Sequence, residues 1–161
     1  MDAFEVDTFE FRELREQKSQ ICRDILDDLP EWFGDPASVD KYVADVAGLP
    51  MFGLVTASGS VAAFLAVKKH FPNSAEAYVL GVRKNFHRQG LGRRMFQHVE
   101  EHLAAEKVRY FTVKTLGPSH ADGYYGTTRL FYEAIGFAPL EEFPLVWGEG
   151  TPCLLMVKTL I

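Results

Sequence analysis

The sequence predicts an α/β domain in which a mixed central β-sheet is flanked by helices. The chain has 161 residues, of which 47% are hydrophobic, which suits one core rather than two domains. Near the N-terminus, apolar residues recur at helical spacing. From residue 51 they alternate with a period of two or form short apolar runs, and near residue 90 the helical spacing returns. No repeat or linker interrupts this order, so we expect a single domain over residues 1–161.

The N-terminal third is predicted to hold an edge strand and two helices. Residues 3–10 alternate weakly, with apolar side chains at Phe4, Val6 and Phe9. Residues 11–29 then carry apolar side chains at helical spacing until Pro30 ends the pattern. Pro36 favours the start of a second helix, because proline is well suited to a first helical turn.

The remaining residues predict a strand meander followed by alternating helices and strands. Strands are expected at residues 51–56, 61–67 and 77–82, with turns at 58–60 and 72–74. A helix over 90–106 precedes a strand over 108–116, and a short helix over 127–135 is closed by Gly136, which suits a left-handed cap. The last two strands lie around 137–147 and 153–160. The predicted order is therefore β-α-α-β-β-β-α-β-α-β-β.

Composition narrows the classes of partner. The 17 Lys+Arg against 22 Asp+Glu give a net charge of -5, which argues against a general nucleic-acid binder. No apolar stretch reaches the roughly 18 residues of a membrane helix, so no membrane partner is expected. The N-terminus resembles no secretory signal, and Cys22 and Cys153 are interpreted as buried free thiols. These features predict a reduced, cytoplasmic protein.

The segment from Ala75 to Arg94 carries the strongest functional signal. A predicted strand runs into a glycine loop, His87-Arg88-Gln89-Gly90-Leu91-Gly92, that opens a helix. Backbone N–H groups and the positive end of the helix dipole converge at such a turn, which therefore favours a phosphate. A dinucleotide fingerprint would need glycine where Met95 stands, and no P-loop Lys follows. Gly90-x-Gly92 alone is also compatible with a tight turn that binds nothing.

A second motif makes the chain resemble the GCN5-related N-acetyltransferases, which use acetyl-coenzyme A. The family's glycine loop is Gln/Arg-x-x-Gly-x-Gly/Ala, and this chain departs from it only at His87. The later family motif, a helix ending in aromatic-Tyr and then Gly-Phe, is matched by residues 131–137. The resemblance implies the family's fold and acetyl-coenzyme A as co-substrate, with no metal. The cofactor-binding residues that it implies are the backbone of Leu80 and Val82 and the loop residues His87, Arg88, Gln89, Gly90, Leu91, Gly92 and Arg93.

The resemblance also implies direct transfer of an acetyl group from the thioester to an amine. Glu76 lies where histone-type members carry their catalytic glutamate and is the candidate base, with a water chain as the alternative. The amide of Leu80 is expected to donate to the oxyanion. Tyr132 occupies the position of the acid that protonates the departing thiolate. The structural alternatives are an exposed strand residue for Glu76 and a packing anchor for Tyr132.

The sequence does not identify the acceptor molecule. Trp32, Phe33 and Trp147 stand beside Gly- or Pro-containing turns and are either core residues or the walls of an acceptor cleft. Glu31, near two of them, would suit a cationic amine. The last strand, around Leu154–Val157, is a candidate for pairing across a homodimer.

Two other functions are compatible with some or all of these motifs. A non-catalytic module that binds or senses acyl-coenzyme A would keep the glycine loop and lack the acid and base. An enzyme with another acyl donor or a hydroxyl acceptor would keep both. His98-Val99-Glu100-Glu101-His102 formally matches an inverted zinc-protease pattern, but it lies beside the apolar stripe of its predicted helix and lacks a third ligand.

Overall fold

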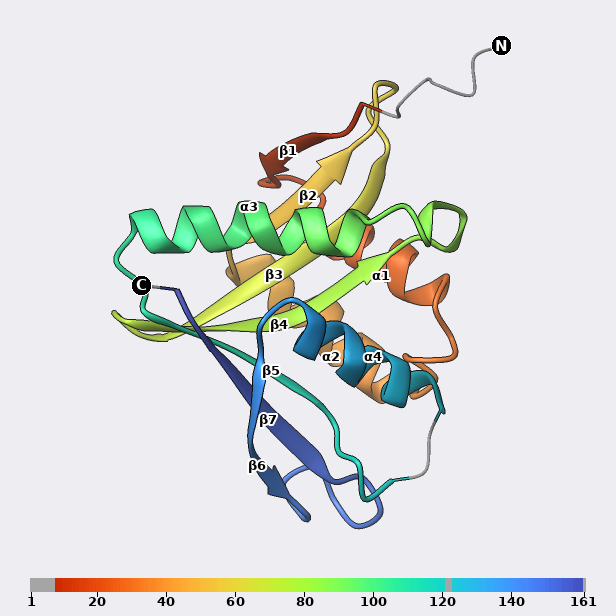
Figure 1. Cartoon of the computed structure of the whole chain (residues 1–161). Coiled ribbons are helices and arrows are strands. Elements are labelled where there is room, and N and C mark those ends of the chain that lie inside the picture. The colour runs from red at the N-terminus through yellow and green to blue at the C-terminus, as the bar shows by residue number, and fades with distance from the viewer. Residues whose placement is uncertain (1–7, 121–122, 161) are drawn as a thin grey trace. The chain divides into compact units, whose positions relative to one another are not determined.

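The computed structural model describes residues 8–120 and 123–160 and confirms the predicted order of elements (Figure 1). The strands are β1 (Glu10–Glu13), β2 (Met51–Val55), β3 (Val61–Phe71), β4 (Ser74–Val82), β5 (Tyr110–Leu116), β6 (Ala138–Phe143) and β7 (Cys153–Thr159). The α-helices are α1 (Lys18–Asp27), α2 (Pro36–Asp45), α3 (Leu91–Ala105) and α4 (Gly123–Ala134), and two short 3-10 helices are η1 (Val46–Gly48) and η2 (Lys84–Phe86).

The strands form one seven-stranded mixed sheet in the order β1-β2-β3-β4-β5-β7-β6. β4 and β5 are parallel, whereas β1–β2, β2–β3, β5–β7 and β6–β7 are antiparallel. The β4–β5 ladder joins Ser74–Ala77 to Tyr110–Val113 and ends there, although β4 continues to Val82 and β5 to Leu116. The mixed central sheet predicted from the sequence is therefore confirmed.

One expectation about the sheet edge is wrong. The strand containing Leu154–Val157 was expected to be available for pairing across a homodimer. In the structure β7 is hydrogen-bonded to β5 on one side and to β6 on the other, so both of its edges are occupied. The edge strand at this end of the sheet is β6, in which Leu140 is exposed.

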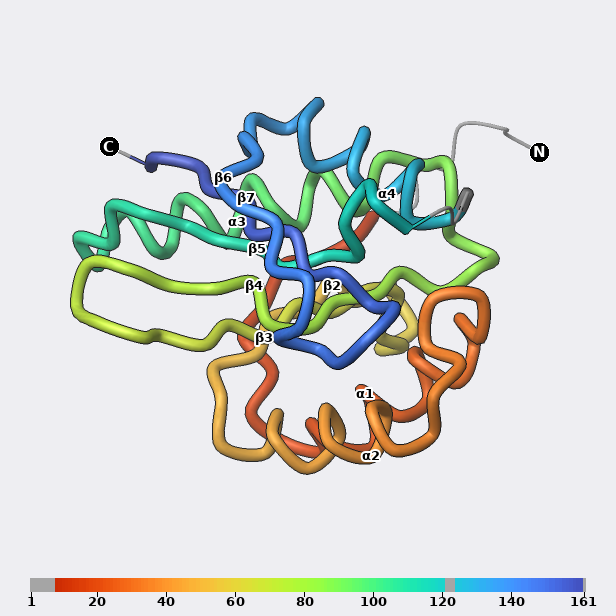
Figure 2. Tube along the Cα trace, turned by 90° about the horizontal axis from the view of Figure 1, so that it is seen from below, coloured from red at the N-terminus to blue at the C-terminus, as the bar shows by residue number. Residues whose placement is uncertain are grey.

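Contacts divide the chain into two compact units, each with its own packing. The first holds the residues up to Val67 together with Val79–Val99, and the second holds Lys68–Tyr78 and the residues from Glu100 onward. Within the first unit, α1 and α2 cover one face of β2 and β3, and the beginning of α3 covers the other face (Figures 1 and 2). Within the second unit, α4 packs on β5.

A missing side chain allows α1 to pack closely on β4. A Cβ added at Gly81 would lie 2.9 Å from Ile25 Cγ2 and 3.0 Å from Leu29 Cδ1. Both of these side chains are buried, and contacts this short are not tolerated in a packed interior. The end of α1 is therefore held against the end of β4, where the glycine loop begins.

The N-terminal boundaries differ from the prediction. Phe4 and Val6 lie outside the described residues, and the strand runs from Glu10 to Glu13 instead of ending at residue 10. Phe11 pairs with Leu54 across β1 and β2, so residues expected to begin a helix join the sheet. Gln17 has a left-handed φ of 55°, and α1 begins only after it. Sheet pairing here overrides a helical spacing that is compatible with either structure.

The hairpin between β3 and β4 is longer than predicted. The strands extend to Phe71 and from Ser74, which leaves a turn of only Pro72 and Asn73. Residues 68–71 are exposed, so they lack the apolar pattern that predicts a strand. The turn is fixed instead by the carbonyl of Asn73, which accepts hydrogen bonds from the amides of Arg109 (2.9 Å) and Tyr110 (3.0 Å).

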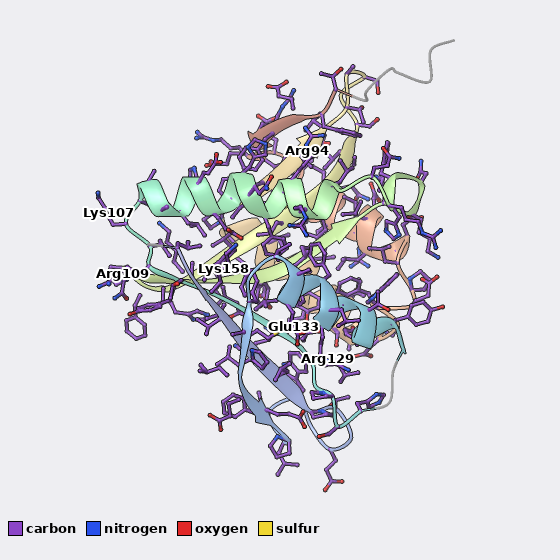
Figure 3. The ribbon with its side chains drawn as sticks, viewed as in Figure 1. Arg94, Lys107, Arg109, Arg129, Glu133 and Lys158 are labelled. Atoms are coloured by element: carbon purple, nitrogen blue, oxygen red, sulfur yellow. The ribbon has the colours of Figure 1, made fainter. Side chains whose placement is uncertain are left out.

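Helix α4 ends at Ala134 and is closed by Gly136 as predicted, although it begins four residues before the expected Thr127. Gly136 has a φ of 108°; its amide donates to Glu133 O (3.0 Å), and that of Phe137 donates to Tyr132 O (3.0 Å). These two bonds form the usual left-handed C-cap. Lys158 Nζ adds a bond to Ile135 O (2.6 Å), where a cation stabilises the helix dipole (Figure 3).

No helix among residues 8–120 and 123–160 combines the length and the apolar composition needed to cross a membrane. Both cysteines are free and buried, as predicted.

The buried thiol of Cys22 makes stability depend on alkaline pH. Burial raises the pKa of Cys22 from 9.0 to about 12, whereas the unfolded chain loses this proton near 9. The stabilisation is complete below pH 9 and falls as the pH rises toward 12, by about 1.4 kcal/mol per unit. Between pH 8 and 10, urea unfolding of the wild type should lose about 1.4 kcal/mol more than that of Cys22→Ala. Equal losses in the wild type and in Cys22→Ala would contradict the raised pKa of Cys22.

Candidate functional site

The glycine loop lies in the first unit and turns the chain sharply from β4 into α3. After Val82, the amide of Arg83 donates to Ala62 O (2.9 Å), which fixes the start of the loop against β3. Arg88 and Gly90 have left-handed φ values of 64° and 75°. Helix α3 then begins at Leu91, as the sequence predicted within one residue.

This backbone geometry presents amide groups to an anion. The first-turn amides of α3, at Leu91, Gly92 and Arg93, have no carbonyl one turn earlier to receive them. In general, successive N–H groups around a left-handed residue in a tight turn can also converge on an anion. A helix N-terminus with such a turn before it can hold a phosphate through main-chain atoms alone.

The side chain of His87 fastens the loop to its surroundings. Its Nε2 lies 2.6 Å from Val82 O, and since a carbonyl can only accept, this nitrogen carries the proton and donates. The ring of Trp32 meets the His87 ring edge to face, with centroids 6.2 Å apart. The one departure from the family loop motif is therefore a residue with defined contacts inside the loop.

The loop between α1 and α2 is attached to the same region. Asp28 Oδ2 accepts a hydrogen bond from the Lys84 amide (2.7 Å), and Lys84 Nζ forms an ion pair with Glu31 Oε1. The hydrogen bond from Lys84 holds the pKa of Glu31 below its usual value. Glu31 Oε2 is buried and has no hydrogen-bond partner among the described residues. The sequence indicated Glu31 as a partner for a cationic amine from its charge alone. Its unpaired oxygen is a structural reason for the same role.

The candidate acceptor residues fall in two places. Trp32 and Phe33 are half-buried in the loop after α1; Trp32 contacts His87, and the Phe33 ring meets Tyr42 edge to face. Trp147 is 43% exposed and follows β6 in the second unit. Leu80 and Val82 are both half-buried on β4, just before the glycine loop.

Arginines near the loop serve different purposes. Arg88 and Arg93 are exposed, so their charges are available to an anion in solvent. The guanidinium of Arg94 lies over the ring of Phe9, 5.6 Å from its centroid, and so belongs to the packing of the N-terminal segment (Figure 3). Its contact with Phe9 therefore distinguishes Arg94 from the exposed Arg88 and Arg93.

Glu76 lies in the second unit and is buried, with 5% of its side chain exposed. The structural alternative, in which Glu76 merely begins an exposed strand, is wrong. Its Oε1 is 2.7 Å from His70 Nε2 and 3.4 Å from Lys114 Nζ. These neighbours come from β3 and β5, the two strands that flank β4 in the sheet. A buried carboxylate needs such partners, and the sequence pattern did not indicate either.

Cys153 is electrostatically coupled to this cluster. Burial raises the pKa of its thiol; the charge of Glu76 acts in the same direction, and that of Lys114 opposes it. Only the thiolate is an effective nucleophile, so Cys153 is held in its unreactive form. The arrangement disfavours a covalent acyl-cysteine intermediate.

Tyr132 is buried near the end of α4, and its position follows from the C-cap. Its ring meets that of Phe137 edge to face, with centroids 5.9 Å apart, and Phe137 in turn contacts Phe111 (5.7 Å). Along β5, Phe111 points to one face of the sheet, whereas Thr112 and Lys114 point to the other. Tyr132 and Glu76 therefore lie on opposite faces of β5.

Arg129 takes a structural role in the second unit. Its Nη1 donates to Leu116 O (2.7 Å) and so ties α4 to the end of β5 (Figure 3).

The two histidines of the zinc pattern have separate partners. His98 stacks on Phe11 with ring centroids 4.6 Å apart, and His102 Nε2 lies 3.7 Å from Glu106 Oε1. Among the described residues, no three metal-ligating side chains gather.

Comparison with solved structures shows the fold. An acetyltransferase structure assigned to the GNAT family from Desulfovibrio desulfuricans superposes with a TM-score of 0.81 at 17% identity, over 96% of this chain and 100% of that one. An aminoglycoside 6'-N-acetyltransferase complexed with coenzyme A gives 0.73 at 17% identity, over 94% and 97%. The ribosomal-protein-S18-alanine N-acetyltransferase from Escherichia coli also gives 0.73 at 17%, over 95% and 94%.

Comparison of sequences identifies the family. No curated protein sequence matches the chain at a significant level. A family model described as an acetyltransferase (GNAT) domain matches residues 48–139, which run from the turn before β2 through the glycine loop to the start of β6. This match covers more than half of the chain and includes both motifs on which the sequence resemblance rested. The protein therefore belongs to the GNAT family of acetyltransferases.

Proposed function

We propose that the chain is a single acetyl-coenzyme A-dependent N-acetyltransferase domain that transfers an acetyl group to a primary amine of a small molecule or peptide. The observation that carries the proposal is the glycine loop, in which left-handed Arg88 and Gly90 precede the free first-turn amides of α3. The free, buried thiols are compatible with a reducing, cytoplasmic setting. The negative net charge favours a cationic acceptor over a nucleic acid.

In this proposal the cofactor is held mainly by backbone. The amides of residues 87–93 bind the pyrophosphate of acetyl-coenzyme A, and the backbone of Leu80 and Val82 aligns its pantetheine arm. Arg88 and Arg93 contribute exposed positive charge that steers the anion. Binding through the main chain explains how His87 can replace the family's Gln or Arg.

The acyl transfer uses one carboxylate, one amide and one phenol. Glu76 removes a proton from the acceptor amine, directly or through water, because an amine with a lysine-like pKa near 10.4 is protonated at neutral pH. The amide of Leu80 stabilises the oxyanion, and Tyr132 protonates the departing thiolate. The positions of Glu76 and Tyr132 on opposite faces of β5 suit an amine that arrives on one side and a thiol that leaves on the other.

The acceptor is proposed to meet Trp32, Phe33 and Trp147. The buried, unpartnered Oε2 of Glu31 supports a cationic group beside Trp32. A coenzyme A release assay with a panel of polyamines, amino acids, aminoglycosides and lysine-bearing peptides identifies the class of acceptor amine. If the cofactor binds but no amine of the panel causes coenzyme A to be released, the alternative of an acyl-coenzyme A sensing module is favoured. A parallel screen of acyl donors and hydroxyl acceptors covers the other alternative.

Gly90→Val tests the phosphate cradle. A Cβ at Gly90 would meet nothing within 4 Å, so the variant should fold, but its φ of 75° is unfavourable for valine and the loop amides should shift. Acetyl-coenzyme A at 100 times its dissociation constant should stabilise the wild type by ~2.7 kcal/mol. We expect thermal unfolding to show this shift in the wild type and not in Gly90→Val.

Gly59→Val is the matched control. Gly59 also has a left-handed φ, of 91°, and its Cβ would meet nothing within 4 Å, but it lies in the turn between β2 and β3. This variant carries similar backbone strain and should keep the full cofactor-induced shift. An unchanged shift in a folded Gly90→Val protein would contradict the cradle.

Glu76→Gln tests the proposed base. The substitution keeps the size of the side chain and removes its ability to accept a proton. Turnover at pH 7 should fall by about 10²-fold or more, and part of the loss should return at high pH as the amine deprotonates unaided. Steady-state kinetics across pH measure both effects. A loss that is the same at every pH would assign the deprotonation to water or to another group.

Tyr132→Phe tests the proposed acid, because it removes the hydroxyl and keeps the ring that packs on Phe137. Turnover should fall by roughly 10²–10⁴-fold, about 3–5 kcal/mol of transition-state stabilisation, with little change in stability or cofactor binding. An acetyl donor whose thiol has a lower pKa should narrow the difference between wild type and variant. If turnover survives and only stability falls, Tyr132 is a packing anchor.

A further inference from the structure

The two carboxylate oxygens of Glu76 have different environments. Both recorded contacts, from His70 Nε2 at 2.7 Å and from Lys114 Nζ at 3.4 Å, are made to Oε1. Oε2 accepts no hydrogen bond from the described residues. A carboxylate held through one oxygen presents the other in a fixed direction. Oε1 is therefore held in place by its neighbours, whereas Oε2 is available to accept a proton.

The direction of the short contact follows from its chemistry. An ionised carboxylate can only accept, so His70 carries its proton on Nε2 and donates it to Oε1. Hydrogen bonds to charged groups are stronger than those between neutral groups, and 2.7 Å is within the range of such bonds. The contact from Lys114 is longer and contributes chiefly charge. His70 is therefore the neighbour that fixes the orientation of the carboxylate.

The backbone on either side of His70 is itself restrained. On one side, Lys68 lies over the ring of Tyr78, with its Nζ 5.3 Å from the ring centroid. The turn that follows is fixed by the two hydrogen bonds to Asn73 O. An imidazole on a segment anchored at both ends can hold a hydrogen bond without a large loss of side-chain entropy.

We propose that His70 is a positioning residue for catalysis: its Nε2–H holds Oε1 of Glu76 so that Oε2 is aimed at the proton of the acceptor amine or of an intervening water. The inference rests on the proposed role of Glu76 as the base. In the proton transfer, the N–H bond of the ammonium or the O–H bond of the water breaks, and the proton bonds to Oε2. Oε1 stays hydrogen-bonded to His70 throughout. His70 itself contacts neither substrate nor cofactor.

The sequence offered no indication of this pair. His70 belongs to the exposed end of β3, where residues 68–71 lack an apolar alternation, and it was not among the candidate residues. The titratable groups that share its surroundings are Lys114 from β5 and, on the Glu76 side, the protonated thiol of Cys153 from β7. Lys114 approaches the same oxygen at 3.4 Å, which is a longer contact than the 2.7 Å hydrogen bond from His70.

A double-mutant cycle on the full chain tests the proposal. His70→Leu fills similar space without a donor, and we expect it to lower kcat by roughly 10-fold or more while the KM for acetyl-coenzyme A and the cofactor-induced thermal shift stay unchanged. His70→Gln, whose amide can donate to Oε1, should recover most of the lost turnover. In the Glu76→Gln background, His70→Leu should cause no further loss, because its effect acts through the carboxylate. The assay uses the amine of the panel with the highest turnover.

Lys69→Met is the matched control. Lys69 is the neighbour of His70 on β3 and is 40% exposed against 38% for His70, but it pairs with Glu106. This variant should keep wild-type kcat. Additive losses in the cycle, or full turnover in His70→Leu when Glu76→Gln is impaired, would overturn the positioning role and leave the base intact. Wild-type turnover in Glu76→Gln would overturn the proposed base and with it the role of His70.

Discussion

The close approach of α1 to β4 at Gly81 is the constraint on which the first unit depends. With no side chain at this position, Ile25 and Leu29 reach the strand, and the segment after α1 comes to the start of the glycine loop. Lys84 then joins that segment through Asp28 and Glu31, and His87 joins it through Trp32. The absence of a side chain at Gly81 thus allows the glycine loop and the loop that carries Trp32 to be held together.

The roles of main chain and side chain are divided between the units. In the proposed mechanism the glycine loop acts through its amides, whose positions depend on φ at Arg88 and Gly90 and on the start of α3. Any residue that keeps that backbone can occupy most of the loop, so histidine at position 87 is free to make structural contacts. Glu76 and Tyr132, in contrast, would act through their side chains in the proposed mechanism, so substitution there should change the chemistry.

The buried carboxylate of Glu76 shows how stability and function are linked in the second unit. An unpaired charge in this environment would be costly, so its placement requires the donors from β3 and β5. Those same donors occupy one oxygen and leave the other open. The contacts that stabilise the buried charge are therefore the same contacts that would orient Glu76 in its proposed role as the base. Tyr132, in contrast, is placed by the C-cap at Gly136 and by packing on Phe137.

The sequence by itself determined the order of the elements, the start of α3, the cap at Gly136 and the two family motifs, because apolar periodicity and glycine positions are local signals. Only the tertiary structure decided that residues 11–13 join β2, that β7 is an interior strand, and that Glu76 is buried between His70 and Lys114. These outcomes depend on partners distant in sequence. Strand pairing and charge compensation are satisfied between segments, so no local pattern in the chain could specify them.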